Sequence, residues 1–306
     1  MAIAPAGVRT GREKVLMGGT DMAKDLFNND TKEKETLREQ YGANPFSVFD
    51  TKEQGWRDRK QWWNSKGILP PLEPMQSKSQ VNMPDDKFIK SASVFDPVLC
   101  ELMYRWYCPD GGTIIDPFAG GSVRGIVAGA MGYGYTGIDI RPEQVASNID
   151  QAAQILPEDK QPKWISGSSN VVLAEMEIAK REFDMLFTCP PYFNLEVYSD
   201  IEGDLSNMEW PAFLATFRSI IRKGCNLLKK DAMAVIVVGE VRSRNGSLYG
   251  LVPATVKAFT DCGMKYYNEA VLETPLVSAQ KRASSCMKHG KLVKVHQNVL
   301  MFKKPF

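Results

Sequence analysis

Residues 188–192 of this 306-residue chain read TCPPY, and their types suggest chemistry at the end of a strand. Apolar residues precede them, so a buried strand is expected to end at Cys189. The two prolines fix φ and donate no hydrogen bonds, which lets the carbonyl groups of Cys189 and Pro190 act as acceptors. Tyr192 adds an aromatic face on which a planar heterocycle can stack. The residues predicted to hold such a ligand are Cys189, Pro190, Pro191 and Tyr192.

Two earlier strand ends carry residues suited to a second ligand. Residues 116–122 read DPFAGGS, in which small residues let the backbone approach a ligand closely and Asp116 offers a carboxylate. Residues 137–140 read GIDI, and Asp139 can accept hydrogen bonds from both hydroxyls of a ribose. The spacing is not the G-x-G-x-x-G pattern of a dinucleotide site. The pair of strand ends therefore predicts a site for a nucleoside-containing cofactor.

The elements that must position these motifs alternate between strand and helix from about residue 88 to 273. This alternation indicates a doubly wound α/β fold, in which ligands bind at the carboxyl ends of parallel strands. The expected strands are GTIIDPF, YGYTGIDI, PKWISG, FDMLFTCPPY and AVIVVGEV, and the expected helices lie near 121–131, 142–155, 169–180 and 210–229. Two apolar runs, 265–274 and 296–304, follow one another with no helix expected between them. They predict an antiparallel pair at the sheet edge.

Composition and segment lengths set the broad class. With 43% apolar and 24% charged residues, the chain is typical of a soluble globular protein. Its longest apolar runs are far shorter than the roughly 20 residues of a membrane helix, and no signal peptide is evident, so a cytoplasmic location without membrane contact is expected. Six dispersed cysteines without a C-x-x-C pair, and two histidines without ligand spacing, predict no metal site.

The chain is expected to have two parts. Residues 1–87 are polar and irregular and predict an N-terminal appendage that could contribute to DNA binding, whereas 88–306 predict the catalytic domain. Three tryptophans of the appendage, Trp56, Trp62 and Trp63, are expected to pack rather than to bind. Within the catalytic domain, 274–296 form a basic connection between the last two strands.

Taken in order, DPFAGGS, GIDI and TCPPY resemble the motifs of the S-adenosylmethionine-dependent amino-methyltransferases that act on DNA. Residues 91–112 are similar to the family's segment that folds over the methionine part of the cofactor. The resemblance covers about 88–304, and within it 188–208 and 296–304 look like the DNA methylases common in bacteriophage genomes. It implies a Rossmann-like seven-stranded methyltransferase fold, S-adenosylmethionine as cofactor and DNA as partner.

The resemblance also assigns roles to residues. The methionine end of the cofactor would lie against the strand end at 116–121, and Asp139 would hold the ribose. The implied cofactor residues are Asp116, Phe118, Ala119, Gly120, Gly121, Asp139 and Ser168. The turn at 189–192 would hold a base turned out of its helix. Acceptors on both amino hydrogens and alignment with the methyl group would promote transfer to the exocyclic nitrogen, without a covalent enzyme intermediate.

Two positions depart from the family pattern. Adenine-N6 enzymes usually have Asp or Asn and cytosine-N4 enzymes Ser where this chain has Cys189, whose sulfur is a weak acceptor. Because Thr188 precedes it, TCPPY is closer to the cytosine-N4 pattern TSPPY, so cytosine N4 is slightly favoured over adenine N6. Ser168 follows the third strand, where the family often has an acidic residue.

Three alternatives remain open. A base amino group in RNA could be the acceptor, or the chain could be a catalytically silent nucleic-acid-binding module. Cys189 could also act as the nucleophile of C5 methylation, but those enzymes have the cysteine after the proline, and no neighbouring cation is evident that would lower its pKa.

Basic residues predict the contacts with nucleic acid. Arg242 and Arg244 follow the fifth strand, and residues 274–306 contain seven Lys/Arg and no Asp/Glu. The predicted DNA contacts are Arg242, Arg244, Lys281, Arg282, Lys288, Lys291 and Lys294.

Overall fold

The computed structural model describes residues 36–77, 94–193, 195–243, 245–273 and 279–305. By its contacts the chain divides after Thr36, and the larger unit, Leu37–Phe306, carries the architecture described below.

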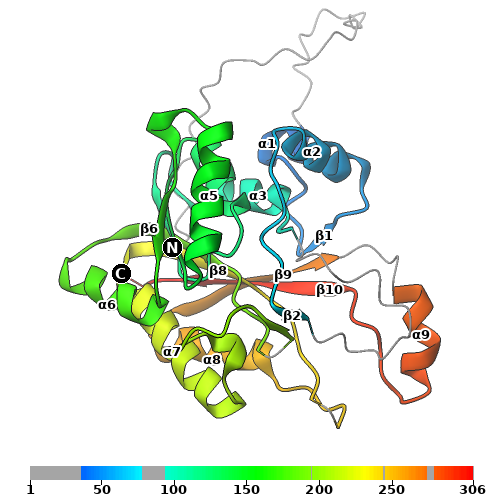
Figure 1. Ribbon diagram of the computed structural model, residues 1–306. Coiled ribbons are helices and arrows are strands. Elements are labelled where there is room, and N and C mark those ends of the chain that lie inside the picture. Colours follow the sequence, from blue (N-terminus) through cyan, green and yellow to red (C-terminus); the bar gives the residue numbers. More distant parts are fainter. Residues whose placement is uncertain (1–35, 78–93, 194, 244, 274–278, 306) are drawn as a thin grey trace, which may run out of the picture. The chain divides into compact units, whose positions relative to one another are not determined.

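An eight-stranded sheet forms the centre of this unit, in the order β1-β9-β10-β8-β6-β3-β4-β5 (Figure 1). Neighbouring strands are parallel except that β10 runs antiparallel to both β8 and β9. Without β1 and β10 the order is that of a doubly wound Rossmann sheet. The expected Rossmann-like fold, mostly parallel with an antiparallel pair, is confirmed. The strands are β1 (Val48–Asp50), β3 (Thr113–Asp116), β4 (Gly134–Asp139), β5 (Lys163–Ser166), β6 (Phe183–Thr188), β8 (Leu228–Val238), β9 (Lys265–Glu273) and β10 (His296–Lys303).

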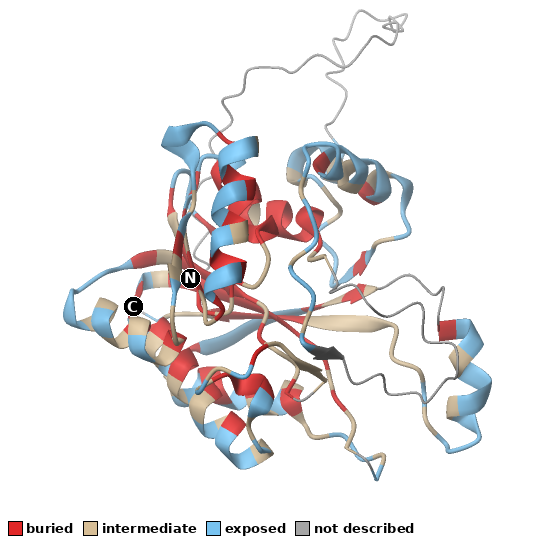
Figure 2. Cartoon of the chain, viewed as in Figure 1, coloured by how far each residue is buried: buried red, intermediate tan, exposed pale blue. Residues whose placement is uncertain are grey.

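Helices cover both faces of the sheet, which explains why its inner strands are continuous apolar runs. Figure 1 shows α3 and α5 on one face and α6, α7 and α8 on the other. The central strands are largely buried, whereas α2 and α9 expose most of their residues (Figure 2). The helices are α1 (Leu37–Tyr41), α2 (Gln54–Asn64), α3 (Pro97–Tyr107), α4 (Val123–Ala130), α5 (Pro142–Ile155), α6 (Ser169–Ile178), α7 (Trp210–Asn226), α8 (Leu251–Asp261) and α9 (Ala279–Met287).

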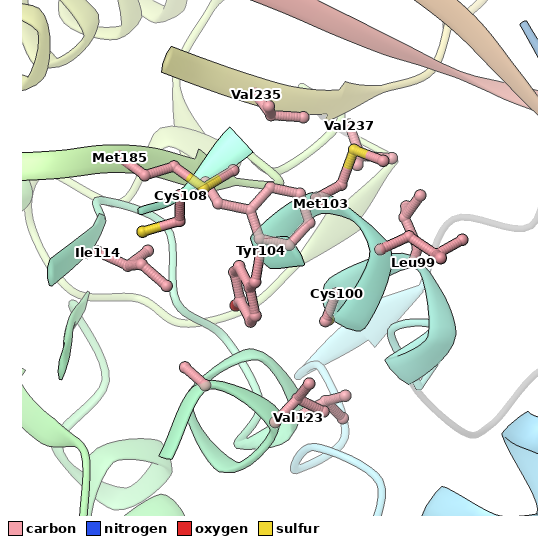
Figure 3. Packing of buried hydrophobic residues seen from close by; sticks show 14 of the residues in the cluster. Leu99, Cys100, Met103, Tyr104, Cys108, Ile114, Val123, Met185, Val235 and Val237 are labelled. Carbon is pink, nitrogen blue, oxygen red and sulfur yellow. The ribbon is translucent and has the colours of Figure 1, made fainter. Parts of the chain in front are cut away.

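The core beneath α3 fixes the strands that carry the site. Figure 3 shows Leu99, Met103 and Tyr104 of α3 among side chains of the sheet, including Val235 and Val237. Tyr104 is fully buried, and its hydroxyl donates to a backbone oxygen of α4. Helix α3 comes directly after residues 94–96, which line the cavity described below, so the burial of α3 anchors these residues.

The last two strands correct the sequence prediction in part. β9 and β10 do form an antiparallel pair, but β10 lies inside the sheet, between β9 and β8. β1 covers the outer side of β9, pairing with it in parallel from Val48↔Val271 to Asp50↔Glu273. The expectation that no helix joins β9 to β10 is wrong, because α9 lies between them. Its sequence, AQKRASSCM, contains the helix formers Ala, Gln, Lys and Arg.

The sequence also did not predict the helices α2, α3 and α8, although α3 and α8 each have an identifiable cap. Asp96 begins α3 by accepting from the backbone N–H of Val98 at 3.0 Å. Glu240 caps α8 from ten residues upstream, accepting from three successive backbone N–H groups, with the bond to Val252 at 2.7 Å. A cap that comes from so far along the chain gives no local sequence signal.

The N-terminal residues from Leu37 onward belong to the same compact unit as the sheet. Trp56 and Trp63 of α2 are buried, as predicted for the tryptophans, whereas Trp62 is 42% exposed. The Glu101 carboxylate of α3 accepts two hydrogen bonds from the Arg59 guanidinium, at 2.6 and 2.9 Å, and a third from the Trp63 indole N–H at 2.8 Å. The unit that contains the sheet therefore begins at Leu37 rather than at residue 88.

Among the described helices, none is both long enough and apolar enough to cross a membrane.

Candidate active site

A cavity of about 520 Å³ lies at the carboxyl ends of the central strands, a size typical of small-molecule sites. It is lined by the loops that follow β3, β4, β5 and β6, so the motifs at these strand ends meet as predicted. The sequence-predicted residues that line it are Phe118, Ala119, Gly120, Gly121, Asp139, Ser168, Cys189, Pro190, Pro191 and Tyr192.

The loop after β3 leaves space for a ligand at Gly120. This residue has φ +52°, and a Cβ built there would meet no atom within 4 Å. Its N–H donates to Asp139 at 2.9 Å, and its carbonyl accepts from the Asn148 amide at 2.7 Å. The loop is thus held from both sides while its open face borders the cavity.

Asp139 retains acceptor capacity after its bonds to the protein are made. Each carboxylate oxygen accepts one backbone N–H, from Gly120 and from Arg141, at 2.9 Å each. Burial raises the pKa of Asp139 to about 6, although these backbone bonds and the charge of Arg141 lower it. The side chain is 14% exposed and lines the cavity. A mostly ionised carboxylate with lone pairs remaining suits the two hydroxyls of a ribose, so the residues present fit a nucleoside-containing cofactor.

Asp116 requires a correction, because it is fully buried and does not line the cavity. Its carboxylate accepts from Arg124 Nε at 2.5 Å, from Thr188 Oγ1 at 2.5 Å and from the Tyr135 hydroxyl at 2.7 Å. These partners occupy both oxygens. Asp116 therefore fastens β3 to β4, to β6 and to α4, and it supports the site from beneath instead of contacting a cofactor.

Arg124 is a site residue that the sequence reasoning missed. Its guanidinium donates to the carbonyls of Phe118 and Ala119, both at 2.7 Å, and lies 4.5 Å from the ring centre of Phe95. Burial lowers the pKa of Arg124, but Asp116, Tyr135 and Cys189 together outweigh burial, so the pKa is raised above its ordinary value. The signal in the sequence is a single arginine within the apolar helix VRGIVAGA, since a buried charge needs a partner.

The TCPPY turn is held in place by the residue that follows it. Phe193 has φ +54°, a left-handed backbone that bulky residues rarely adopt. Its ring is 2% exposed and meets the rings of Trp210, Phe213 and Tyr249 edge-on at 4.9–5.3 Å. Because this aromatic cluster fixes the ring, it also fixes the unusual backbone and the position of Tyr192 before it.

Tyr192 is restrained by contacts with its ring and with its hydroxyl. A Cβ at Gly239, the first residue after β8, would lie 3.0 Å from the Tyr192 ring. The hydroxyl accepts from Gln297 Nε2 at 2.7 Å and lies 3.7 Å from Cys189 Sγ. Burial raises the pKa of Tyr192 well above its ordinary value, so the phenol stays neutral.

The Cys189 thiol is not activated as a nucleophile. Burial raises its pKa above the ordinary value, and the charge of Arg124 offsets this only in part. A thiol with a raised pKa is protonated at neutral pH and is a poor nucleophile.

The N-terminal strap, residues 69–77, forms a wall of the cavity that the sequence reasoning did not foresee. Its backbone is held by α5: Leu69 N–H donates to Gln151 at 3.1 Å and Leu72 N–H to Gln144 at 2.9 Å. Pro71 lies so close to Gly121 that a Cβ there would come within 2.9 Å of it. The strap ends in β2 (Gln76–Ser77), which pairs with β7 (Glu196–Val197) just after the TCPPY turn.

Of the predicted DNA contacts that the structure describes, none lines the cavity. Arg242 donates to the Gly246 carbonyl at 2.8 Å within its own loop, and Arg244 lies outside the described residues. Lys281 and Lys288 are exposed, whereas Arg282 is half-buried. The remaining two are engaged: Lys291 lies against Gly246, and Lys294 Nζ bonds to Asn298 at 3.3 Å.

No group of three His, Cys, Asp or Glu side chains in the described ranges is arranged to hold a metal ion.

Neither a protein-family model nor a curated protein matches the chain. Several solved structures do match the chain. TrmN from Thermus thermophilus matches with a TM-score of 0.47 at 13% identity, over 69% of this chain and 49% of its own. A protein from Streptococcus mutans assigned as a SAM-dependent methyltransferase matches with a TM-score of 0.48 at 14% identity, over 70% and 50% of the two chains.

A second protein from Thermus thermophilus, assigned as a DNA modification methylase, matches with a TM-score of 0.33 at 22% identity, over 45% of this chain and 50% of its own. The chain spans about half the length of each of these three proteins.

Proposed function

We propose that this chain transfers a methyl group from S-adenosylmethionine to an exocyclic amino nitrogen of a base in DNA. The observation that carries the proposal is one cavity that joins Gly120 and Asp139 on one side to the TCPPY turn on the other. A cofactor site and a site for a planar amine thus share a continuous space. This arrangement fits a transfer in which no protein group needs to carry the methyl.

The cofactor side of the cavity supplies hydrogen-bond acceptors and room. Asp139 accepts from the ribose hydroxyls, while the open face of Gly120 lets the backbone lie close to the ligand. Phe118, Ala119 and Ser168 complete this wall, and Arg124 keeps the loop in position through its bonds to the loop carbonyls. When bound, S-adenosylmethionine supplies a methyl group on a positively charged sulfur.

The base side supplies a stacking surface and carbonyl acceptors. The base lies on the ring of Tyr192, and the carbonyls of Cys189 and Pro190 accept from its amino group. An aromatic amine is a weak nucleophile because its lone pair is delocalised into the ring. Acceptors on its hydrogens favour a more pyramidal nitrogen, and fixed alignment supplies much of the remaining rate advantage.

The state of Cys189 favours amino transfer over C5 transfer. C5 chemistry requires a thiolate that adds to the pyrimidine ring, whereas the raised pKa of Cys189 keeps this thiol protonated. Among amino acceptors, cytosine N4 remains slightly favoured, because TCPPY is closer to the cytosine-N4 pattern.

DNA is proposed as the partner for two reasons: the motifs resemble those of DNA amino-methyltransferases, and a basic segment follows β9. The exposed Lys281 and Lys288 on and beside α9 are suited to phosphate contact.

The test is methyl transfer from labelled S-adenosylmethionine to mixed-sequence duplex DNA, single-stranded DNA and RNA in parallel. The nucleic acid is then digested and the modified nucleoside identified by mass. N4-methylcytosine or N6-methyladenine in DNA is the expected product. Transfer to RNA alone, 5-methylcytosine as product, or cofactor binding without transfer to any of the three would each overturn the proposal.

A further inference from the structure

The base side of the cavity lacks one acceptor if Cys189 stands where related enzymes have Asp, Asn or Ser. A thiol sulfur accepts hydrogen bonds only weakly. We infer that Gln297, at the start of β10, supplies this acceptor through its side-chain oxygen and touches the amino group of the base. The inference rests on the proposed function and concerns which protein group completes the site.

The direction of β10 explains why Gln297 reaches the ligand-binding edge. β10 runs antiparallel to β8, and Asn298 is paired with Val238, the last residue of β8. The first residues of β10 therefore lie beside the carboxyl end of β8, at the edge of the sheet that carries the cavity. Gln297 itself is paired with Leu272 of β9, and both residues line the cavity.

The hydrogen bond to Tyr192 orients the Gln297 amide. Nε2 donates to the Tyr192 hydroxyl at 2.7 Å, so Oε1 occupies the other branch of the planar carboxamide. Within the described part of the chain, no protein group forms a hydrogen bond to Oε1. Cys189 Sγ lies 3.7 Å from the same Tyr192 hydroxyl, so the side chains of Gln297 and Cys189 both lie next to this hydroxyl on the base side of the cavity.

The five carboxylates that also line the cavity are less suited to this role. Asp139 lies on the cofactor side, Asp96 pairs with Lys60 at 2.9 Å, and Asp204 accepts from the Ser199 hydroxyl at 2.7 Å. Glu196 is engaged by the hydroxyl of Tyr198. Glu273 pairs with Lys52 at 2.6 Å, and its side chain is 35% exposed. Gln297 thus combines a place beside Tyr192 with an acceptor oxygen that these protein contacts leave available.

The chemistry requires a second acceptor because an amino group carries two hydrogens. One hydrogen is accepted by a backbone carbonyl of the TCPPY turn and the other by Gln297 Oε1. As the nitrogen forms its bond to the methyl carbon, the sulfur–carbon bond breaks with its electron pair left on sulfur. The surplus proton on nitrogen then passes to water. Gln297 stays unchanged throughout and is a catalytic residue in the sense that it contacts the reacting amine.

The experiment is a double-mutant cycle between positions 189 and 297, measured as methyl transfer to mixed-sequence DNA. Gln297→Met keeps the length of the side chain but removes the acceptor oxygen, and we expect turnover to fall about tenfold, the loss typical of one hydrogen bond. Cofactor affinity, measured by calorimetry, should stay unchanged and shows that the variant is folded. Gln297→Leu serves the same purpose if the methionine variant does not fold.

The decisive arm adds an acceptor at position 189. In Cys189→Asn or Cys189→Ser, the loss caused by Gln297→Met should shrink to less than about threefold, because the new side chain now accepts from the amine. Tyr192→Phe is the control: it removes the Tyr192–Gln297 bond that orients the amide but keeps the Gln297 oxygen, so we expect it to lower turnover less than Gln297→Met does. If Gln297 only positioned Tyr192, Tyr192→Phe and Gln297→Met would lower turnover equally, and an acceptor at 189 would relieve neither.

The role of Gln297 would be overturned if Gln297→Met kept full turnover, or if it lowered turnover equally with Cys, Asn and Ser at position 189. Either outcome would leave the proposed function intact. Absence of any transfer by the unaltered chain to DNA would instead remove the proposed function and this inference with it.

Discussion

Asp139 is the residue on which cofactor affinity should depend most directly, because its carboxylate faces the cavity with lone pairs remaining. Losing charge-assisted bonds to a ribose costs about 1.5–3 kcal/mol, so Asp139→Ala should weaken S-adenosylmethionine binding at least about tenfold. Asp150→Ala is the matched control: this exposed aspartate of α5 does not line the cavity, and its removal should change affinity less than about twofold. Calorimetry distinguishes the two, and unchanged affinity in Asp139→Ala would refute the ribose contact.

The same carboxylate should make cofactor affinity depend on pH. Burial raises the pKa of Asp139 to about 6, so the side chain is mostly ionised at pH 7.5 and mostly protonated at pH 5. Since the ionised form is the better acceptor, affinity should be full above this pKa and fall roughly tenfold between pH 7.5 and pH 5. In Asp139→Asn this step should disappear. A step of equal size in both proteins would assign the titration to another group.

Tyr192 should affect the base and not the cofactor. Tyr192→Ala removes a stacking surface worth roughly 1–3 kcal/mol, so turnover on DNA should fall by about fivefold or more while cofactor affinity is retained. Gly239→Ala offers an independent check, because its Cβ would lie 3.0 Å from the ring and displace it. Normal turnover in both variants would make the TCPPY turn purely structural.

Residue types could be predicted from the sequence better than residue contacts. Gly120, Asp139 and Tyr192 were predicted because strand ends of a doubly wound sheet converge at one edge. Asp116 was misjudged because its partners, Arg124 and Tyr135, come from other elements whose side-chain directions the sequence does not give.

At the scale of elements, α2 should contribute to stability through one of its two adjacent tryptophans. Trp63 is 2% exposed and bonded to Glu101, so Trp63→Ala should lower the free energy of unfolding by about 3–5 kcal/mol. Trp62 is 42% exposed, with Arg59 4.1 Å from its ring centre. Trp62→Ala should therefore cost less than about 1 kcal/mol. Denaturant unfolding measures both, and equal effects would mean that α2 is not docked as described.

Elements with local signals could be predicted, and those with distant partners could not. The helices α4 to α7 and the inner strands follow from apolar runs and their spacing. β1 consists of the three residues Val48–Asp50, and its pairing depends on β9, more than two hundred residues later. The extended strap likewise acquires its place from Gln144 and Gln151 of α5, which no local pattern reveals.

For the whole molecule, the basic segment after β9 should determine how binding to DNA responds to salt. If the exposed Lys281 and Lys288 contact phosphates, replacing both by alanine should flatten the slope of log affinity against log salt by up to about 1.8. Binding to all sequences should weaken alike. The control is the pair Lys163 and Lys230, which are also exposed but lie near the amino ends of β5 and β8, at the opposite edge of the sheet.

An equal slope in the Lys281/Lys288 variant and in the Lys163/Lys230 control would place the nucleic acid elsewhere. The Lys291 and Lys294 side chains are less suited to this experiment than the sequence suggested, because each is engaged by the neighbouring loop or strand.

The pairing of β1 with β9 has a consequence for how the chain folds. Thr51 Oγ1 donates to the carbonyl of Glu273 at 2.7 Å, a contact between residues 222 positions apart. During synthesis the N-terminal residues leave the ribosome first, yet their partner strand is made near the end. Contacts of such long sequence separation form slowly, because the entropy of closing a large loop is lost before the contacts can stabilise the structure. The apolar side of α2, which includes Trp63, must therefore wait exposed or be shielded by a chaperone until α3 and then β9 emerge.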